Sequence, residues 1–168
     1  MSLHGDLLSQ AEDLAKREPN RPKQASLRRS VSSAYYAVFH LLIDAASRFV
    51  VRGGDRVSLR HAVARTFDHG EMKFAANTFK GGALPHALQD AVKGPISTEL
   101  KRLSEGFIEL QQARHEADYN LSRTFTRDEA LDLLRTAAQA FDDWQVVANT
   151  QAGDAFLVAL LLRRKLDR

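Results

Sequence analysis

Residues 24–51 read QASLRRSVSSAYYAVFHLLIDAASRFVV, and this stretch decides the fold class. Its apolar side chains recur at steps of four and three residues, which places them on one face of a helix. Pro22 precedes the stretch and Gly53-Gly54 follows it, and these residue types are typical of helix boundaries. We therefore predict a long helix from about Gln24 to Val51. Its apolar row comprises Leu27, Val31, Ala34, Val38, Leu41 and Ala45, and is widened by Tyr35, Tyr36 and Phe39.

Helical spacing recurs along most of the remaining chain, and the alternating pattern of strands is scarce. One long helix is predicted from Pro95 to Asn120 and another from Thr126 onward. At the start of the latter, Thr126 and Glu129 form a capping box, in which each side chain bonds a backbone amide of the other. The two apolar rows are Leu100, Leu103, Phe107, Leu110, Arg114, Ala117 and Leu121, and Ala130, Leu134, Ala137, Phe141, Trp144 and Ala148.

Shorter helices complete the prediction. We expect them at residues 2–17, at 58–79 with an interruption at Gly70, at 84–92 as a helical turn, and at 154–166 beyond Gly153. Three long rows of one type predict an all-α, up-and-down bundle of four or five main helices with an additional C-terminal helix. The chain would then divide into a bundle, residues 1–150, and a C-terminal segment, residues 151–168.

The composition is that of a globular protein without covalent staples. The 168 residues are 44% hydrophobic and 27% charged and include no cysteine, which excludes a disulfide scaffold and a cysteine nucleophile. No secretory signal and no stretch of roughly 20 apolar residues occurs, so we expect a cytoplasmic protein that binds no membrane. The net charge of +3 permits binding to a phosphate backbone without requiring it. Histidine spacings typical of metal sites are missing, and we expect neither a metal nor another cofactor.

The run from Ala155 to Leu162 is apolar on every side of its predicted helix. Such a helix must be covered by other apolar groups. The cover could come from the bundle of the same chain, from a second subunit or from a partner protein. We favour a dimer or partner contact.

Arg114 is the anomaly of the predicted helix from Pro95 to Asn120. The spacing places its guanidinium in an apolar row, where a charge without a partner is costly. Asp118 lies one turn further on the same face, and Tyr119 is next to it. Two interpretations stay open. One is a structural ion pair near the helix end or at a dimer contact; the other is an anion or phosphate site, in which Arg114 supplies donors and Asp118 orients it.

Two segments together resemble a known family. SAYYAVFH at residues 33–40 and RHEADY at residues 114–119 resemble the HEPN superfamily, the higher eukaryotes and prokaryotes nucleotide-binding domain. They look like the A-Y-Y-A-x-F-H and R-x-x-x-D-Y helices of small bacterial HEPN proteins. The order, the separation and the capped helix that follows are also similar. The resemblance covers about Leu7 to Val147 and leaves the last helix outside.

The resemblance implies a helical bundle, often a homodimer, in a prokaryotic stress, toxin–antitoxin or defence system. It makes an antitoxin or a nucleotidyltransferase-type protein a candidate partner. Many such domains are ribonucleases whose signature is an arginine followed, after four to six residues, by a histidine; here positions 119–121 are Tyr, Asn and Leu. We therefore predict a noncatalytic module that binds RNA or a nucleotide. The alternatives are a metal-independent endoribonuclease with a displaced base and a protein–protein interaction domain.

The candidate residues follow from these interpretations. A displaced base would be His40, which belongs to the first motif, although a histidine bonded to a neighbouring helix is the simpler reading. Arginines bind phosphates and tyrosine rings stack on bases, whereas solvated arginines and core aromatics are the alternatives. The catalytic candidates are Arg114, Asp118, Tyr119 and His40, and the candidates for anion or nucleic-acid binding are Arg114, Arg28, Arg29 and Tyr36.

Overall fold

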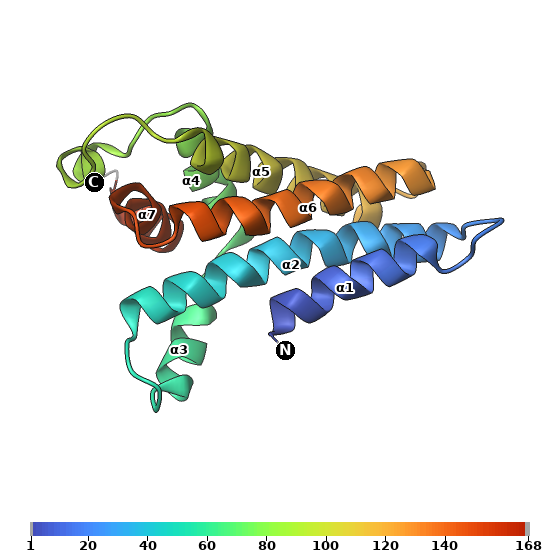
Figure 1. The fold of residues 1–168 in the computed structure, drawn as a ribbon, viewed down its shortest axis with the longest axis horizontal. Helices are drawn as coiled ribbons and strands as arrows, with labels where there is room; N and C mark the ends of the chain where they lie inside the picture. Colours follow the sequence, from blue (N-terminus) through green and yellow to red (C-terminus); the bar gives the residue numbers. More distant parts are fainter. Residues whose placement is uncertain (1, 167–168) are drawn as a thin grey trace. The chain divides into compact units, whose positions relative to one another are not determined.

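The computed structural model of the protein describes residues 2–166, and only the backbone of residues 163 and 164. The predicted all-α class is confirmed: the structure is 76% helical, its helices pack as a bundle, and the described residues contain no strand. The predicted C-terminal segment, residues 151–168, ends beyond the described residues. The helices are α1 (Leu3–Lys16), α2 (Gln24–Val50), α3 (Val57–Ala64), α4 (His69–Lys80), the 3-10 helix η1 (His86–Ala91), α5 (Thr98–Tyr119), α6 (Arg127–Val147) and α7 (Gln151–Leu166) (Figure 1).

The capping box at the start of α6 is confirmed. The backbone N–H of Thr126 donates to Oε2 of Glu129 at 2.7 Å, and the backbone N–H of Glu129 donates to Oγ1 of Thr126 at 3.1 Å. Both bonds satisfy amides that the helix itself cannot pair. The hydrogen bonds from Thr126 and Arg123 keep the pKa of the Glu129 carboxyl below its ordinary value, so the cap stays charged near neutral pH.

Two predicted boundaries are wrong. α5 begins at Thr98 rather than Pro95, because the Ser97 hydroxyl accepts the N–H of Leu100 at 3.2 Å and so caps the helix there. The region 58–79 breaks at residues 65–68 rather than at Gly70. Gly70 lies in the first turn of α4, where Oδ1 of Asp68 accepts its N–H at 2.9 Å. The cap compensates for the low helix propensity of glycine.

The apolar rows follow the prediction near the middle of α2 and then drift by one residue. Leu27, Val31, Ala34 and Val38 are buried, but further along Leu42 and Ala46 are buried while Leu41 and Ala45 are half-buried. An α-helix has 3.6 residues per turn, so a row read at 3.5 residues drifts around it. On α6 Ala130 and Ala137 are buried as predicted. Leu133, Ala140 and Val147 are buried in place of Leu134, Phe141 and Ala148, which are half-buried.

The chain divides into two compact units. Unit 1 combines the chain up to His40 with Gly106–Asp142, and unit 2 combines Leu41–Glu105 with the chain from Asp143 onward. Three long helices, α2, α5 and α6, therefore contribute residues to both units. The division into residues 1–150 and 151–168 stays a prediction.

Unit 1 packs α1 and parts of α2, α5 and α6 around one core. α1 and α2 lie side by side in opposite directions, joined where the hydroxyl of Ser30 donates to the carbonyl of Ala11 at 2.7 Å (Figure 1). α1 and α6 are also antiparallel: the rings of His4 and Phe141 lie 5.7 Å apart, and at the other end Arg127 donates to the carbonyl of Ala15 at 3.1 Å. The core includes Tyr35, Phe107, Leu110, Ala130 and Ala137, all fully buried.

Unit 2 contains the apolar C-terminal helix, α7. The rings of Phe79 on α4 and Phe156 on α7 meet edge to face, with their centroids 5.1 Å apart. Ala155, Leu157, Ala159 and Leu160 are also buried, so the chain itself covers most of this run, and a dimer or partner contact of α7 stays a prediction. The Asp143 carboxylate on α6, 2% exposed, accepts the Nε and Nη2 of Arg102 on α5 at 2.9 and 2.5 Å.

The turn between α6 and α7 differs from the prediction. Gly153 does not separate the helices: α7 already begins at Gln151, and the break is Asn149, which has φ of 65°. Asparagine tolerates this left-handed conformation better than most residues. Gly153 lies in the first turn of α7, so close to the end of α6 that an added Cβ would lie 2.1 Å from the carbonyl oxygen of Val147.

Among the described residues, no single helix combines the length and the apolar character that a membrane span requires. Only α6 and α7 taken together, as a bent pair, meet that criterion of length and composition.

We expect Gly153→Ala to destabilise the protein by about 2 kcal/mol, because the new methyl group collides with backbone that cannot move away easily. Urea unfolding monitored by circular dichroism measures this loss. Gly54→Ala is the matched control, since an added Cβ there meets nothing within 4 Å. Equal midpoints for the two variants would show that the α6–α7 turn tolerates a side chain.

Candidate anion-binding site

Two helices of unit 1 supply the predicted site. Tyr36 and His40 lie one turn apart on α2, and Arg114, Asp118 and Tyr119 lie in the last turns of α5. The structure brings Arg114, Asp118, Tyr119 and Tyr36 together, and we call these four residues the Arg114 cluster. The cluster forms because α5 presents Arg114 in its buried row, next to Leu110 and Ala117.

The guanidinium of Arg114 is held from both helices. Its Nη2 donates to the hydroxyl oxygen of Tyr36 at 2.6 Å, and its Nε lies 2.9 Å from Oδ2 of Asp118. The second contact is an ion pair without the alignment of a hydrogen bond. Only 16% of the Arg114 side chain is exposed. The charge is thus compensated inside the row, and a small part of the side chain remains accessible.

Aromatic rings surround the same guanidinium. Its Cζ lies 5.3 Å from the ring centroid of Tyr36, 5.6 Å from that of Tyr119 and 5.9 Å from that of Tyr35. Burial alone would lower the pKa of Arg114, but the hydrogen bond to Tyr36 and the electrostatic attraction of Tyr36, Asp118 and Tyr119 raise this pKa above its ordinary value. Arg114 is therefore positively charged at neutral pH.

Asp118 has a second anchor that the sequence does not reveal. Its Oδ1 accepts a hydrogen bond at 2.6 Å from the hydroxyl of Ser32 on α2, and Ser32 is 1% exposed. One carboxylate oxygen thus bonds α2 while the other faces Arg114 on its own helix. This arrangement fixes the orientation of the carboxylate, as the role predicted for Asp118 requires.

Arg28 lies near the cluster but contacts protein backbone. Its Nη1 donates to the carbonyl of Ala117 at 2.8 Å, and its Nη2 contacts the carbonyls of Asn120, Leu121 and Arg123. These carbonyls belong to the end of α5 and the turn after it, where a helix leaves acceptors unpaired. Arg28 therefore caps α5 from α2. The anion-binding role given to it stays a prediction.

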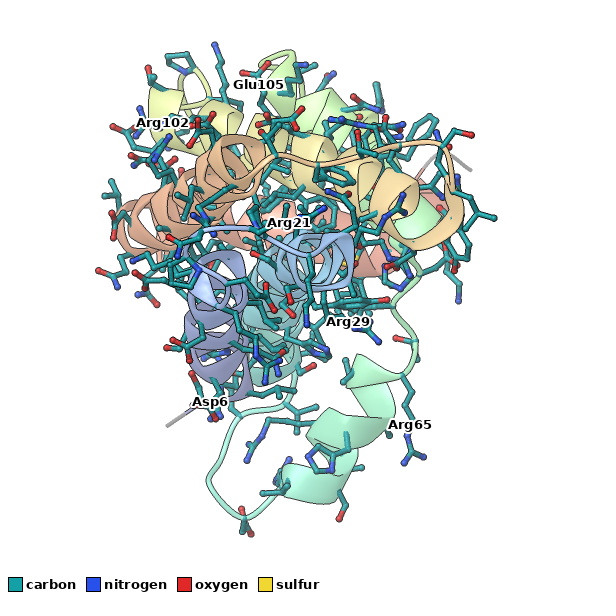
Figure 2. The ribbon with its side chains drawn as sticks, turned by 90° about the vertical axis from the view of Figure 1, so that its right-hand side faces the viewer. Asp6, Arg21, Arg29, Arg65, Arg102 and Glu105 are labelled. Atoms are coloured by element: carbon teal, nitrogen blue, oxygen red, sulfur yellow. The ribbon has the colours of Figure 1, made fainter. Side chains whose placement is uncertain are left out.

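Two of the predicted residues, Arg29 and Tyr119, lie at the surface. Arg29 is exposed on α2 (Figure 2), and Tyr119 is 64% exposed. Leu121, predicted as the last member of the apolar row of α5, is 92% exposed; that prediction is wrong, because α5 ends at Tyr119 and Leu121 lies in the following turn. The ring of His115 lies 5.2 Å from that of Tyr119, so two rings stand together at the exposed side of the helix.

His40 adjoins the cluster through Tyr36. Their ring centroids lie 6.3 Å apart, and His40 is half-buried. Burial, and to a smaller extent the charge of His4, lower the pKa of His40 below 6.5. A neutral imidazole at pH 7 can accept a proton, which is the property required of a base.

A groove on unit 1 has the opposite charge. It has a volume of about 390 Å³, lies between α5 and α6, and has an apolar floor that includes Phe125 and Leu133. Its charged lining is Glu109, Glu116, Arg123, Glu129 and Asp132. Four carboxylates and one guanidinium repel a phosphate, so this groove does not suit an anion.

Known proteins provide no further guide to the site. No family model, no curated protein and no solved structure matches the chain, so the HEPN resemblance rests on its two motifs alone. Within the described part of the chain, no group of three or more His, Asp or Glu side chains is placed to hold a metal ion.

Tyr36→Phe should lower the free energy of unfolding by about 1.5 kcal/mol, because it removes the acceptor of a hydrogen bond from a charged, mostly buried group. Chemical denaturation measures the change. Tyr119→Phe keeps the ring beside Arg114 and is expected to have little effect, since that tyrosine is exposed. A loss of equal size in both variants would contradict the role given to the Tyr36 hydroxyl.

His40 should titrate below pH 6.5 in the folded protein. The unfolded chain then takes up the proton first as the pH falls, so the stability that His40 contributes is complete above pH 6.5 and declines below it. NMR titration of the imidazole resonances measures the pKa. In His4→Gln it should move up but stay below 6.5, because burial is the larger cause. A pKa above 6.5 in the unaltered protein would contradict this environment.

Proposed function

We propose that the protein is a cytoplasmic, HEPN-like helical module that binds RNA or a nucleotide through the Arg114 cluster. The observation that carries the proposal is a guanidinium held in an apolar row by Tyr36 and Asp118, with 16% of its side chain still exposed. A planar fork of donors in a fixed orientation suits a phosphate group. The antiparallel packing of α1 against α2 and α6 in unit 1 is compatible with the up-and-down bundle that the apolar rows predict.

The rings around the cluster suit the other part of a nucleotide. Tyr119 is exposed and stands beside both Arg114 and His115. Bases stack on such rings without sequence preference, and a nearby arginine adds to this binding. We therefore assign phosphate binding to Arg114 and base stacking to Tyr119, with Asp118 and Tyr36 as the residues that position the guanidinium.

The biological setting remains part of the proposal. The resemblance supports a prokaryotic stress, toxin–antitoxin or defence system, a homodimer, and an antitoxin or nucleotidyltransferase-type partner. The third reading, a protein–protein interaction domain, gains support from the fact that Tyr36 and Asp118 already compensate the charge of Arg114. The binding experiment below separates these readings.

Arg114→Ala should weaken binding of a labelled single-stranded RNA about tenfold or more, since a hydrogen-bonded charge is lost. Fluorescence anisotropy measures the affinity. Arg114→Lys keeps the charge without the fork and should bind at an intermediate level, and circular dichroism shows which variants fold. Arg135→Ala, an exposed arginine on α6, is the control. Unchanged binding in a folded Arg114 variant would leave the cluster with a structural role only.

A second function, metal-independent ribonuclease, is favoured by the position and the protonation state of His40. A neutral histidine beside Tyr36, which bonds Arg114, could act as the displaced base. If so, the protein cleaves RNA in EDTA, and His40→Ala lowers the rate about 100-fold or more while binding persists. Gel analysis of labelled RNA measures the rate. Cleavage that survives in His40→Ala, or none in the unaltered protein, would exclude His40 as the base.

A further inference from the structure

The positive charge of the protein is concentrated in one short segment. Residues 48–65 contain five arginines and one aspartate, a formal charge of +4. The whole chain has 24 basic and 21 acidic side chains, or +3, so all its other residues together carry −1. The segment runs from the last turn of α2 to the end of α3 and belongs to unit 2.

Two of these arginines have structural partners. Arg48 pairs with Asp44 one turn earlier on α2, at 2.8 Å. Arg60 on α3 donates to the carbonyls of Val51, Gly53 and Gly54. The bonds of Arg60 tie the loop after α2 to α3 and so hold the segment in one conformation.

The other three arginines face solvent. Arg52, Arg56 and Arg65 are exposed, and none forms an ion pair with another residue that the structure describes. Figure 2 shows the side chain of Arg65 projecting away from α3. These three positive charges are therefore not neutralised by ion pairs and are available to bind a polyanion.

α3 itself packs poorly on the protein. None of its eight residues, all of which the structure describes, is buried, and Val57 and Leu59 are 48% and 55% exposed. A helix that contributes no residue to the core adds little to the stability of the fold, so stability alone does not account for its presence. Its position is instead set by the loop and by Arg60.

We infer that residues 48–65 form a second contact surface for a nucleic-acid backbone, with Arg52, Arg56 and Arg65 as the phosphate-binding residues. The inference rests on the proposed RNA ligand and names a part of the protein that the Arg114 cluster does not include. Phosphate contacts by flexible arginines give affinity without base specificity, which suits three solvated side chains around one short helix.

A membrane surface fits the same segment less well. An interfacial helix needs one apolar face opposite its charged face. With about 100° between successive residues, Val57 lies between Arg60 and His61 around α3, whereas Leu59 and Val63 lie on the opposite side, so the apolar residues do not share one face. The helix has only eight residues, and its apolar area is too small to anchor it in lipid.

The test compares the salt dependence of binding of a labelled oligouridylate to three variants of the full chain. The segment variant replaces Arg52, Arg56 and Arg65 by Gln. The control variant replaces three other exposed basic residues by Gln and so changes the net charge equally: Lys93, Lys101 and Arg135. The third variant is Arg114→Ala. Each single-strand phosphate contact contributes about −0.7 to the slope of log affinity against log salt, so loss of three contacts should make the slope less steep by about 2 in the segment variant alone.

Every outcome decides. A slope that is the same in the segment and control variants overturns the inference, as does a lack of RNA binding by the unaltered protein at low salt. A less steep slope in the segment variant, together with full affinity in Arg114→Ala, supports this surface and overturns the proposed Arg114 site. An unchanged slope in the segment variant, together with weaker binding in Arg114→Ala, supports the Arg114 site and overturns this surface. Flotation with vesicles of equal parts phosphatidylserine and phosphatidylcholine completes the test: vesicle binding lost in the segment variant, with RNA binding unchanged, identifies a lipid surface and overturns the inference.

Discussion

The contact between the guanidinium of Arg114 and the hydroxyl of Tyr36 is the constraint on which unit 1 depends. A guanidinium in an apolar row can remain only where acceptors meet it, here from both helices, and this restricts the register between α2 and α5. The bond from Ser32 to Asp118 and the cap that Arg28 provides act at the same face, at 2.6 and 2.8 Å. A shift of either helix by one residue would break all three contacts, whereas a purely apolar face would tolerate it.

The features that depend on neighbours in sequence were predictable. The capping box of Thr126 and Glu129 and the pair Arg114–Asp118 each lie within about one turn of helix. The ends of α2 follow from the proline and glycine residues beside it. From the sequence, Arg28 is a candidate for anion binding. Its contact with the carbonyls at the end of α5 could not be predicted, because these lie about ninety positions away along the chain. Sequence spacing cannot show such a contact.

The errors at turns have a local cause. Composition predicts helix breaks at Gly153 and Gly70, but each lies inside a first turn, where a hydroxyl or carboxylate cap supports the backbone. The break before α7 is Asn149, which has a left-handed backbone conformation. Asparagine is also common at ordinary surface positions, so the sequence alone does not mark it as a helix break. Similarly, the uncovered charges of Arg52, Arg56 and Arg65 are hidden by a modest net charge of +3, because acidic residues elsewhere offset them.

The two-part construction of unit 1 has a consequence for the order of events during synthesis. Its first part ends at His40, and its second part begins only at Gly106. While the ribosome extends the intervening residues, Tyr36, Ser32 and Arg28 lack their contacts with α5 and the turn after it, and the face of α2 that packs on α5 stays open to solvent. The nascent chain therefore carries an unfinished core over a long stretch of translation, when a chaperone could bind α2.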